Sequence, residues 1–161
     1  MRAFSVAAAA LCLAGPLAAQ NSASASVTAT VQQPITVTKN NDLSFGSVFP
    51  GLDKSIAVTA GGAAKFTVAG QASTPVNLTF TLPATIASGG NTLAIGSWIG
   101  HHATTDVTSG GTTFTPSTSA TAATLSGSGA LYVHVGATAQ PTATQAAGSY
   151  SGSMTMTVVY F

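Results

Sequence analysis

Hydrophobic and polar residues alternate along several stretches of the chain, most regularly near its carboxy-terminal end. Alternate side chains of a β-strand point to opposite faces, so a period of two predicts a strand with one buried and one solvent-facing side. From Gly148 to Phe161, fourteen residues at about 3.3 Å each would span about 45 Å. The segment is therefore either one unusually long strand or a strand preceded by a turn at Gly148. Its apolar positions are Tyr150, Met154, Met156, Val158 and Tyr160.

The same reasoning predicts a series of shorter strands through the middle of the chain. They are expected at residues 55–59, 63–69, 75–82, 92–99 and 131–135. Residues 110–119 contain mostly Gly, Thr, Ser and Pro and are expected to form a long loop or a poor edge strand. Strands at spacings near ten residues, with no helical period, predict an all-β fold, an immunoglobulin-like antiparallel β-sandwich.

The amino-terminal end has the pattern of a secretory signal peptide. Arg2 precedes an apolar run that ends at Gly15, and small residues follow at Ala18 and Ala19. The run is shorter than the roughly 20 apolar residues of a membrane span. We expect cleavage after Ala19, with a second usable site at Ala25, and therefore a signal peptide at 1–19 and a β-sandwich domain at 20–161. This export route leads through the periplasm to the cell surface or the medium.

The segment that follows the signal also alternates. Its apolar positions are Ala23, Ala25, Val27, Ala29 and Val31, and they precede an interruption at Pro34. One interpretation is a donor strand that pairs with another molecule, and the other is the first strand of the chain's own domain. The alanines bury little area, whereas full burial of Val27 and Val31 would contribute roughly 1.5 to 3 kcal/mol each.

Charged residues make up only 4% of the chain, and the predicted signal contains its only arginine and its only cysteine. Without the signal, three lysines (39, 54 and 65) balance three aspartates (42, 53 and 106), so the formal net charge is zero. A surface with so little charge repulsion tends to associate with its own copies. Nucleic acid is excluded as a partner because its binding depends on clustered Lys and Arg.

Few residues could carry chemistry. His101, His102 and Asp106 could bind a metal, with His134 as a distant fourth ligand, but adjacent histidines share one ion only in a loop, because on a strand they face opposite ways. The alternative is a polar loop after Trp98, and we expect neither a metal nor another cofactor. Blue copper is excluded because the mature chain lacks the cysteine ligand.

Catalysis is not supported by the remaining residues. There is no Gly-x-Ser-x-Gly elbow, since the Gly148–Gly152 segment has Tyr150 at its centre. Three aspartates offer little for paired-carboxylate chemistry, and two of them lie beside turn signals. Trp98, Tyr132 and Tyr160 could stack on sugars, but a tryptophan in a sandwich is more often part of the core. We therefore expect a non-enzymatic protein.

Two stretches resemble known families. Gly148, the alternating positions after it and the penultimate Tyr160 resemble the last strand of fimbrial subunits built by the chaperone-usher pathway. That resemblance implies a periplasmic chaperone and an outer-membrane usher as partners. The segments 27–31, 34–37 and 42–48 resemble the opening of a secreted bacterial family called domain of unknown function 4402, and more loosely spore-coat-U fimbrial subunits. The latter usually carry a cysteine near Pro34 that is missing here.

These observations lead to an expectation about function. The chain is expected to be a secreted structural or adhesive cell-surface protein, a fimbria-like subunit that pairs strands with copies of itself or with related subunits. The alternative is a monomeric periplasmic or extracellular module that binds carbohydrate or metal. A membrane-spanning role is not expected.

Overall fold

The computed structural model of the chain describes residues 21–161, and within them all regular structure is β. The all-β prediction is therefore confirmed. No helix in this part of the chain is long and apolar enough to span a bilayer. The strands are β1 (Thr36–Asn41), β2 (Lys54–Ile56), β3 (Ala64–Ala69), β4 (Pro75–Thr81), β5 (Thr85–Ser88), β6 (Asn91–Ala103), β7 (Thr112–Phe114), β8 (Thr121–Thr124), β9 (Ala130–Gln140) and β10 (Thr155–Tyr160).

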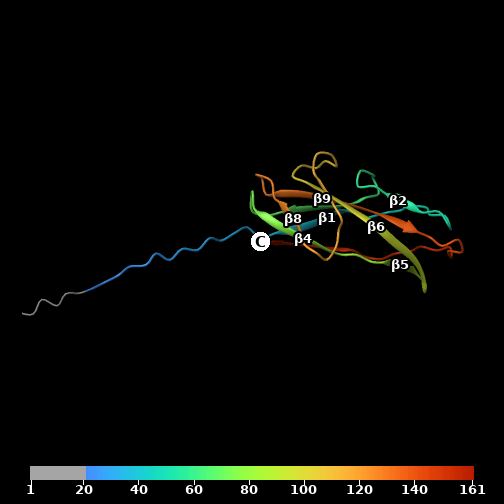
Figure 1. Cartoon of the computed structure of the whole chain (residues 1–161), viewed down its shortest axis with the longest axis horizontal. Helices are drawn as coiled ribbons and strands as arrows, with labels where there is room; N and C mark the ends of the chain where they lie inside the picture. Colours follow the sequence, from blue (N-terminus) through green and yellow to red (C-terminus); the bar gives the residue numbers. More distant parts are fainter. Residues whose placement is uncertain (1–20) are drawn as a thin grey trace, which may run out of the picture. The chain divides into compact units, whose positions relative to one another are not determined.

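The strands form two antiparallel sheets (Figure 1). The larger sheet has the order β1-β3-β9-β6-β5, with β2 paired to β9 and β7 paired to β6. The smaller sheet has the order β10-β4-β8. The long strand β9 pairs with β3, β2 and β6, so it forms the centre of the larger sheet. This arrangement agrees with the predicted sandwich.

The alternating residues of the central strands supply the core between the sheets. In β4 the buried positions are Val76, Leu78 and Phe80, while the residues between them are partly buried or exposed. The main core cluster combines these residues with others from β3, β8, β9 and β10. A second, smaller cluster is built on Leu93 and Ile95 of β6 and the alanines at 137 and 139 of β9. The period of two thus places one side of each strand in the core.

A β-bulge in β6 changes which side chains face the core. The register with β9 shifts between Gly96 and Ile99, because these residues are three positions apart on β6 while their partners, Thr138 and Gly136, are two positions apart on β9. Ser97 within it has a φ of +48°, a left-handed conformation that is uncommon for residues other than glycine. One additional residue exchanges the two faces of a strand. As a result Ile95 faces the core before the bulge, whereas His102 and not His101 faces it afterwards.

The structure corrects several predicted elements. His101 and His102 lie within β6 and not in a polar loop, since β6 continues to Ala103. The final strand is observed only at Thr155–Tyr160, and Gly148–Met154 precedes it with a single bridge, between Ser151 and Ala87. The strands β5 and β8 are not predicted by the sequence pattern, because each has only four residues.

The amino-terminal segment differs most from its prediction. The first strand begins at Thr36, and residues 21–35 form no strand. The interpretation of residues 27–31 as the first strand of the chain's own domain is therefore wrong. Alternation makes a segment suitable for a sheet, but a strand exists only when a neighbour supplies its hydrogen bonds. The predicted signal peptide lies outside the described residues.

Candidate functional site

One edge of the smaller sheet is unpaired. β10 forms a continuous antiparallel ladder with β4, from Thr155 opposite Thr81 to Tyr160 opposite Val76. Within residues 21–161 no strand pairs with the other edge of β10. An unpaired edge presents a row of backbone N–H and C=O groups that can accept a further strand. The last strand therefore presents a free edge in this part of the chain.

An open groove lies next to the segment that precedes β10, and its cavity measures about 930 Å³. One wall is the segment 41–50 after β1, and the other is the segment 145–154 before β10. Apolar side chains of β3, β5 and β6 line it between these walls. Protein interiors seldom leave spaces larger than a water molecule, so a cavity of this size is a gap in the packing between the sheets. Its apolar lining residues are Leu43, Phe45, Val48, Phe66, Ile86, Leu93, Ile95, Trp98, Tyr150 and Met154.

Tyrosine hydroxyls fix both the end of β10 and the segment that leads into it. At the carboxy-terminal end of β10, the Tyr160 hydroxyl donates to the Gln33 carbonyl at 2.8 Å and accepts from the Gln71 amide at 2.7 Å. These bonds tie β10 to the residues that precede β1 and to those that follow β3. At the other end, the Tyr150 hydroxyl donates to the Ala146 carbonyl at 2.7 Å, and the Gln145 amide group donates to that hydroxyl at 2.7 Å. The bonds of Tyr150 therefore fix the wall that precedes β10.

Of the predicted assembly-strand residues, Gly148, Tyr150 and Met154 line the groove, whereas those of β10 itself do not. Met156 is buried in the main core, and Met154, Val158 and Tyr160 pack partly buried against it. Tyr150 packs against the second cluster. Gly148 approaches β5 so closely that a Cβ would lie 2.7 Å from the Ser88 hydroxyl. These residues come from two elements, the strand β10 and the segment that leads into it.

The predicted donor segment, residues 23–31, pairs with no strand of the described chain. Residues 21–31 form no strand, and the side chains of Val27 and Val31 are 95% and 94% exposed. Isolated exposed valines are ordinary, but here they alternate with alanines on one face of an extended segment.

The histidines occupy different faces of the larger sheet. His102 points inward toward Phe114, with ring centroids 5.7 Å apart. His101 lies on the outer face directly opposite His134 of β9, with ring centroids 6.5 Å apart. The loop that follows β6 covers this face, because a Cβ on Gly111 would lie 2.7 Å from the His101 ring. The predicted pair His101 and His102 therefore cannot share one ion.

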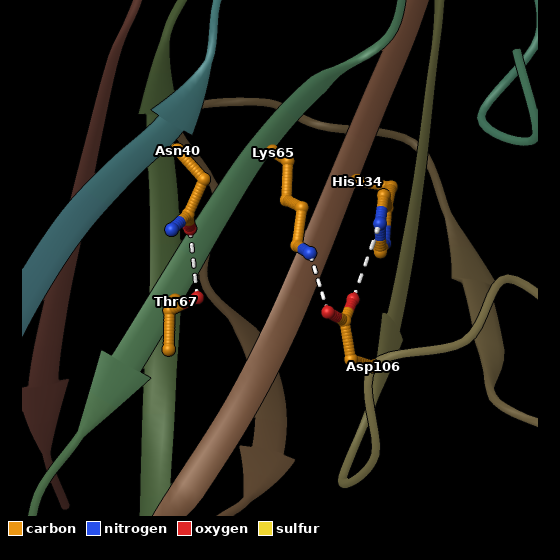
Figure 2. Close-up of polar contacts among 5 residues, drawn as sticks. All are labelled: Asn40, Lys65, Thr67, Asp106 and His134. Carbon is orange, nitrogen blue, oxygen red and sulfur yellow. Dashed lines mark hydrogen bonds and ion pairs between the residues drawn. The ribbon is translucent and has the colours of Figure 1, made fainter. Parts of the chain in front are cut away.

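Asp106 joins this outer-face cluster from the covering loop. Its carboxylate lies 2.5 Å from the Lys65 ammonium and 4.0 Å from Nε2 of His134 (Figure 2). On the same face Thr67 donates to the Asn40 side chain at 2.7 Å. The sequence reasoning missed the role of Lys65. The available signal was a charged residue in the middle of a strand pattern, because Lys65 lies between the buried residues Ala64 and Phe66 of β3.

These groups do not form a metal centre. Among residues 21–161 no three His, Cys, Asp or Glu side chains come close enough to hold a metal ion. Nδ1 of His101, Nδ1 of His134 and Nε2 of His102 are buried without a hydrogen-bond partner in this part of the chain. Burial without a partner disfavours the protonated form of an imidazole.

Acid is therefore expected to destabilise the domain. Burial lowers the pKa of His102, and the charge of His101 lowers it further. Burial and the charge of Lys65 lower the pKa of His134, with Asp106 opposing them. Because the unfolded pKa is higher, near 6.5, the unfolded chain binds more protons in this range. The melting temperature should fall as the pH decreases from 7.5 to 5, and the decrease should be smaller in His134→Gln. An identical pH profile for that variant would contradict the assignment.

The three aromatic residues considered for sugar stacking do not share a surface. Trp98 packs against both core clusters and lines the groove. Tyr132 lies on the outer face, where the Lys65 ammonium is 5.9 Å from its ring centroid. Tyr160 lies at the end of β10, where its hydroxyl bonds to the backbone. They cannot act together as a platform.

Comparison with known proteins identifies the family. No curated protein matches the chain. The family model described as Domain of unknown function (DUF4402) matches residues 35–160. This match covers all ten strands in full, and it includes both walls of the groove. The chain therefore belongs to the DUF4402 family.

Proposed function

We propose that this protein is a secreted, non-enzymatic structural subunit of a surface fibre that assembles by strand pairing. The observation that carries the proposal is the unpaired edge of β10, together with an apolar groove along the segment that leads into this strand. The chain also contains an alternating segment, residues 23–31, that forms no strand of its own. A fibre follows when the segment of one copy enters the groove of the next.

The energetic gain of such pairing has two sources. The inserted segment makes backbone hydrogen bonds with β10, and its inward side chains fill the groove. Val27 and Val31 are almost fully exposed, so burial of each would contribute about 1.5 to 3 kcal/mol. A gain of this size supports pairing that is specific but needs the hydrogen bonds along the edge. Before assembly, a periplasmic chaperone would protect the same edge and an outer-membrane usher would receive the subunit.

Two charge variants test the proposal. Val27→Asp with Val31→Asp places carboxylates on the inward face of the segment, where insertion would have to desolvate them. Thr28→Asp with Thr30→Asp adds the same charge on the outward face. We expect the valine variant of the mature protein to remain a folded monomer and the threonine variant to form polymers, measured by light scattering and negative-stain microscopy. Deletion of residues 21–31 should give the same result as the valine variant.

The proposal fails if the deletion variant forms the same polymers as the wild type. It also fails if both charge variants lose polymers equally, since that outcome would indicate an effect of charge alone. In either case the free edge of β10 would have another role.

A monomeric ligand-binding module is the second candidate, because Trp98 and Tyr150 line a cavity of about 930 Å³. Pockets that bind small molecules have volumes in this range. This function predicts that a soluble oligosaccharide raises the melting temperature of the monomer, and that Trp98→Ala abolishes the increase. A panel of oligosaccharides without effect would exclude it.

A further inference from the structure

An exposed apolar turn lies at one end of the domain. Phe49 and Leu52 are 66% and 64% exposed, although both are large hydrophobic residues. The turn is well fixed: the Leu52 amide donates to the Phe49 carbonyl at 3.1 Å, and the Gly51 amide donates to the Thr142 carbonyl at 3.0 Å. Gly51 has a φ of +73°, which suits glycine. Two large apolar side chains held rigidly in solvent suggest a binding surface.

We infer that this Phe49–Leu52 turn is where the body of a second copy docks when its amino-terminal segment fills the groove. The inference rests on the proposed function and adds to it a contact outside the groove. It follows from the direction of β10, from the length of the connection after the segment, and from the position of the turn.

The turn and the start of the domain lie at opposite ends. β2 follows the turn and pairs with residues 137–139, at the end of β9. The beginning of β9 pairs with Val68 and Ala69 of β3, next to Thr36 of β1. The C-terminus lies at this second end, away from β2 (Figure 1). We call the end with Phe49 the distal end and the end with Gln33 and Tyr160 the proximal end.

The direction of β10 determines where a partner must sit. β10 runs toward the proximal end, where Tyr160 bonds to Gln33. A segment antiparallel to it runs toward the distal end, so its residue 31 leaves the groove there. If the segment of the same chain filled the groove, its residue 31 would have to lie at the proximal end, beside Gln33. The segment would then run parallel to β10. Every ladder in residues 21–161 is antiparallel, which favours a second copy as the occupant.

The connection is too short to keep the two domains apart. Only Gln32 separates Val31 from Gln33, which already belongs to the proximal end of the second copy. An extended residue spans at most about 3.6 Å, so the proximal end of one copy must lie against the distal end of the next. The proximal end also carries an exposed apolar residue, Phe161, which is 65% exposed. Contact between two different surfaces at opposite ends is heterologous, so it gives an open filament when the rotation between copies does not close a ring.

The test uses the full mature chain with Phe49→Ser and Leu52→Ser together. The change removes two apolar side chains that the contact between copies would bury. It should therefore raise the concentration needed for polymerisation at least tenfold, measured by light scattering. Val107→Ser with Ile99→Ser, which changes exposed apolar residues elsewhere, is the matched control and should polymerise like the wild type. The melting temperature of each variant shows whether it is folded, and Phe49→Ser alone serves if the double variant is not.

A second measurement separates this inference from the proposed function. A synthetic peptide of residues 21–31 is titrated into the full-length Val27→Asp, Val31→Asp chain, with and without the two serine changes. We expect equal peptide affinity in both, because the peptide carries no domain to dock. The inference is overturned if the mature chain with only the two serine changes polymerises at the wild-type concentration although the peptide binds. If the peptide does not bind at all, the proposed function fails and the inference fails with it.

Discussion

Replacing Phe80 by alanine is expected to lower the free energy of unfolding by about 3 to 5 kcal/mol, the usual cost of removing a buried phenylalanine. Phe80 is 2% exposed, and its ring lies 5.7 Å from that of Phe114. On β4 it pairs with Met156 of β10, so a cavity here would open between the two sheets. For a domain of this size the melting temperature should fall by about 10 °C or more.

Phe49→Ala is the matched control for this change. It removes the same side chain from an exposed turn, so we expect the free energy of unfolding of the monomer to change by less than about 0.5 kcal/mol. Urea unfolding of both variants on the non-polymerising deletion background makes the comparison independent of assembly. Equal destabilisation by the two changes would mean that Phe80 is not in the core of the folded molecule.

Replacing Gly129 by alanine should have the second largest effect. Gly129 has a φ of +78°, and an added Cβ would overlap the carbonyl oxygen of Gly70. The Gly70 amide donates to the Gly129 carbonyl at 2.9 Å, so the two backbones are held together and cannot separate without losing this bond. Left-handed strain of about 1 to 2 kcal/mol and a forced displacement of about 1 to 3 kcal/mol together predict a loss of roughly 2 to 4 kcal/mol.

Gly127 provides the control within the same turn. No atom lies within 4 Å of the position that its Cβ would take, and its φ is not in the left-handed range. Gly127→Ala should therefore leave the melting temperature close to that of the wild type. A similar decrease in both variants would indicate that the turn between β8 and β9 depends on flexibility and not on the close approach of Gly70.

Local alternation was sufficient to predict the class of the fold and its best-defined strands. β4 is observed at Pro75–Thr81, within one residue of the range expected from Val76, Leu78 and Phe80. The same signal failed for residues 23–31, which alternate as regularly but form no strand. Periodicity describes which face a side chain would take, whereas strand formation depends on a partner that the local sequence does not contain.

The two histidine faces and the groove depend on information that is not local. The bulge at Ser97 exchanges the faces of β6, and Gly96 beside it is a local signal for a bulge but not for the exchange of faces. Lys65 and Asp106 are 41 positions apart and meet only because the loop after β6 folds over the outer face. The groove likewise arises from how segments 41–50 and 145–154 are spaced across the fold. Its lining residues could be recognised as apolar, but their common cavity could not be predicted.

The central position of β9 has a consequence for how the protein forms. Its partners β3 and β6 end at Ala69 and Ala103, well before β9 begins at Ala130, and they do not pair with each other. Chains whose contacts join distant residues fold slowly, typically within milliseconds to seconds. The larger sheet cannot close until residues 130–140 are available, so a growing chain remains without its tertiary structure until almost the whole sequence has been synthesised.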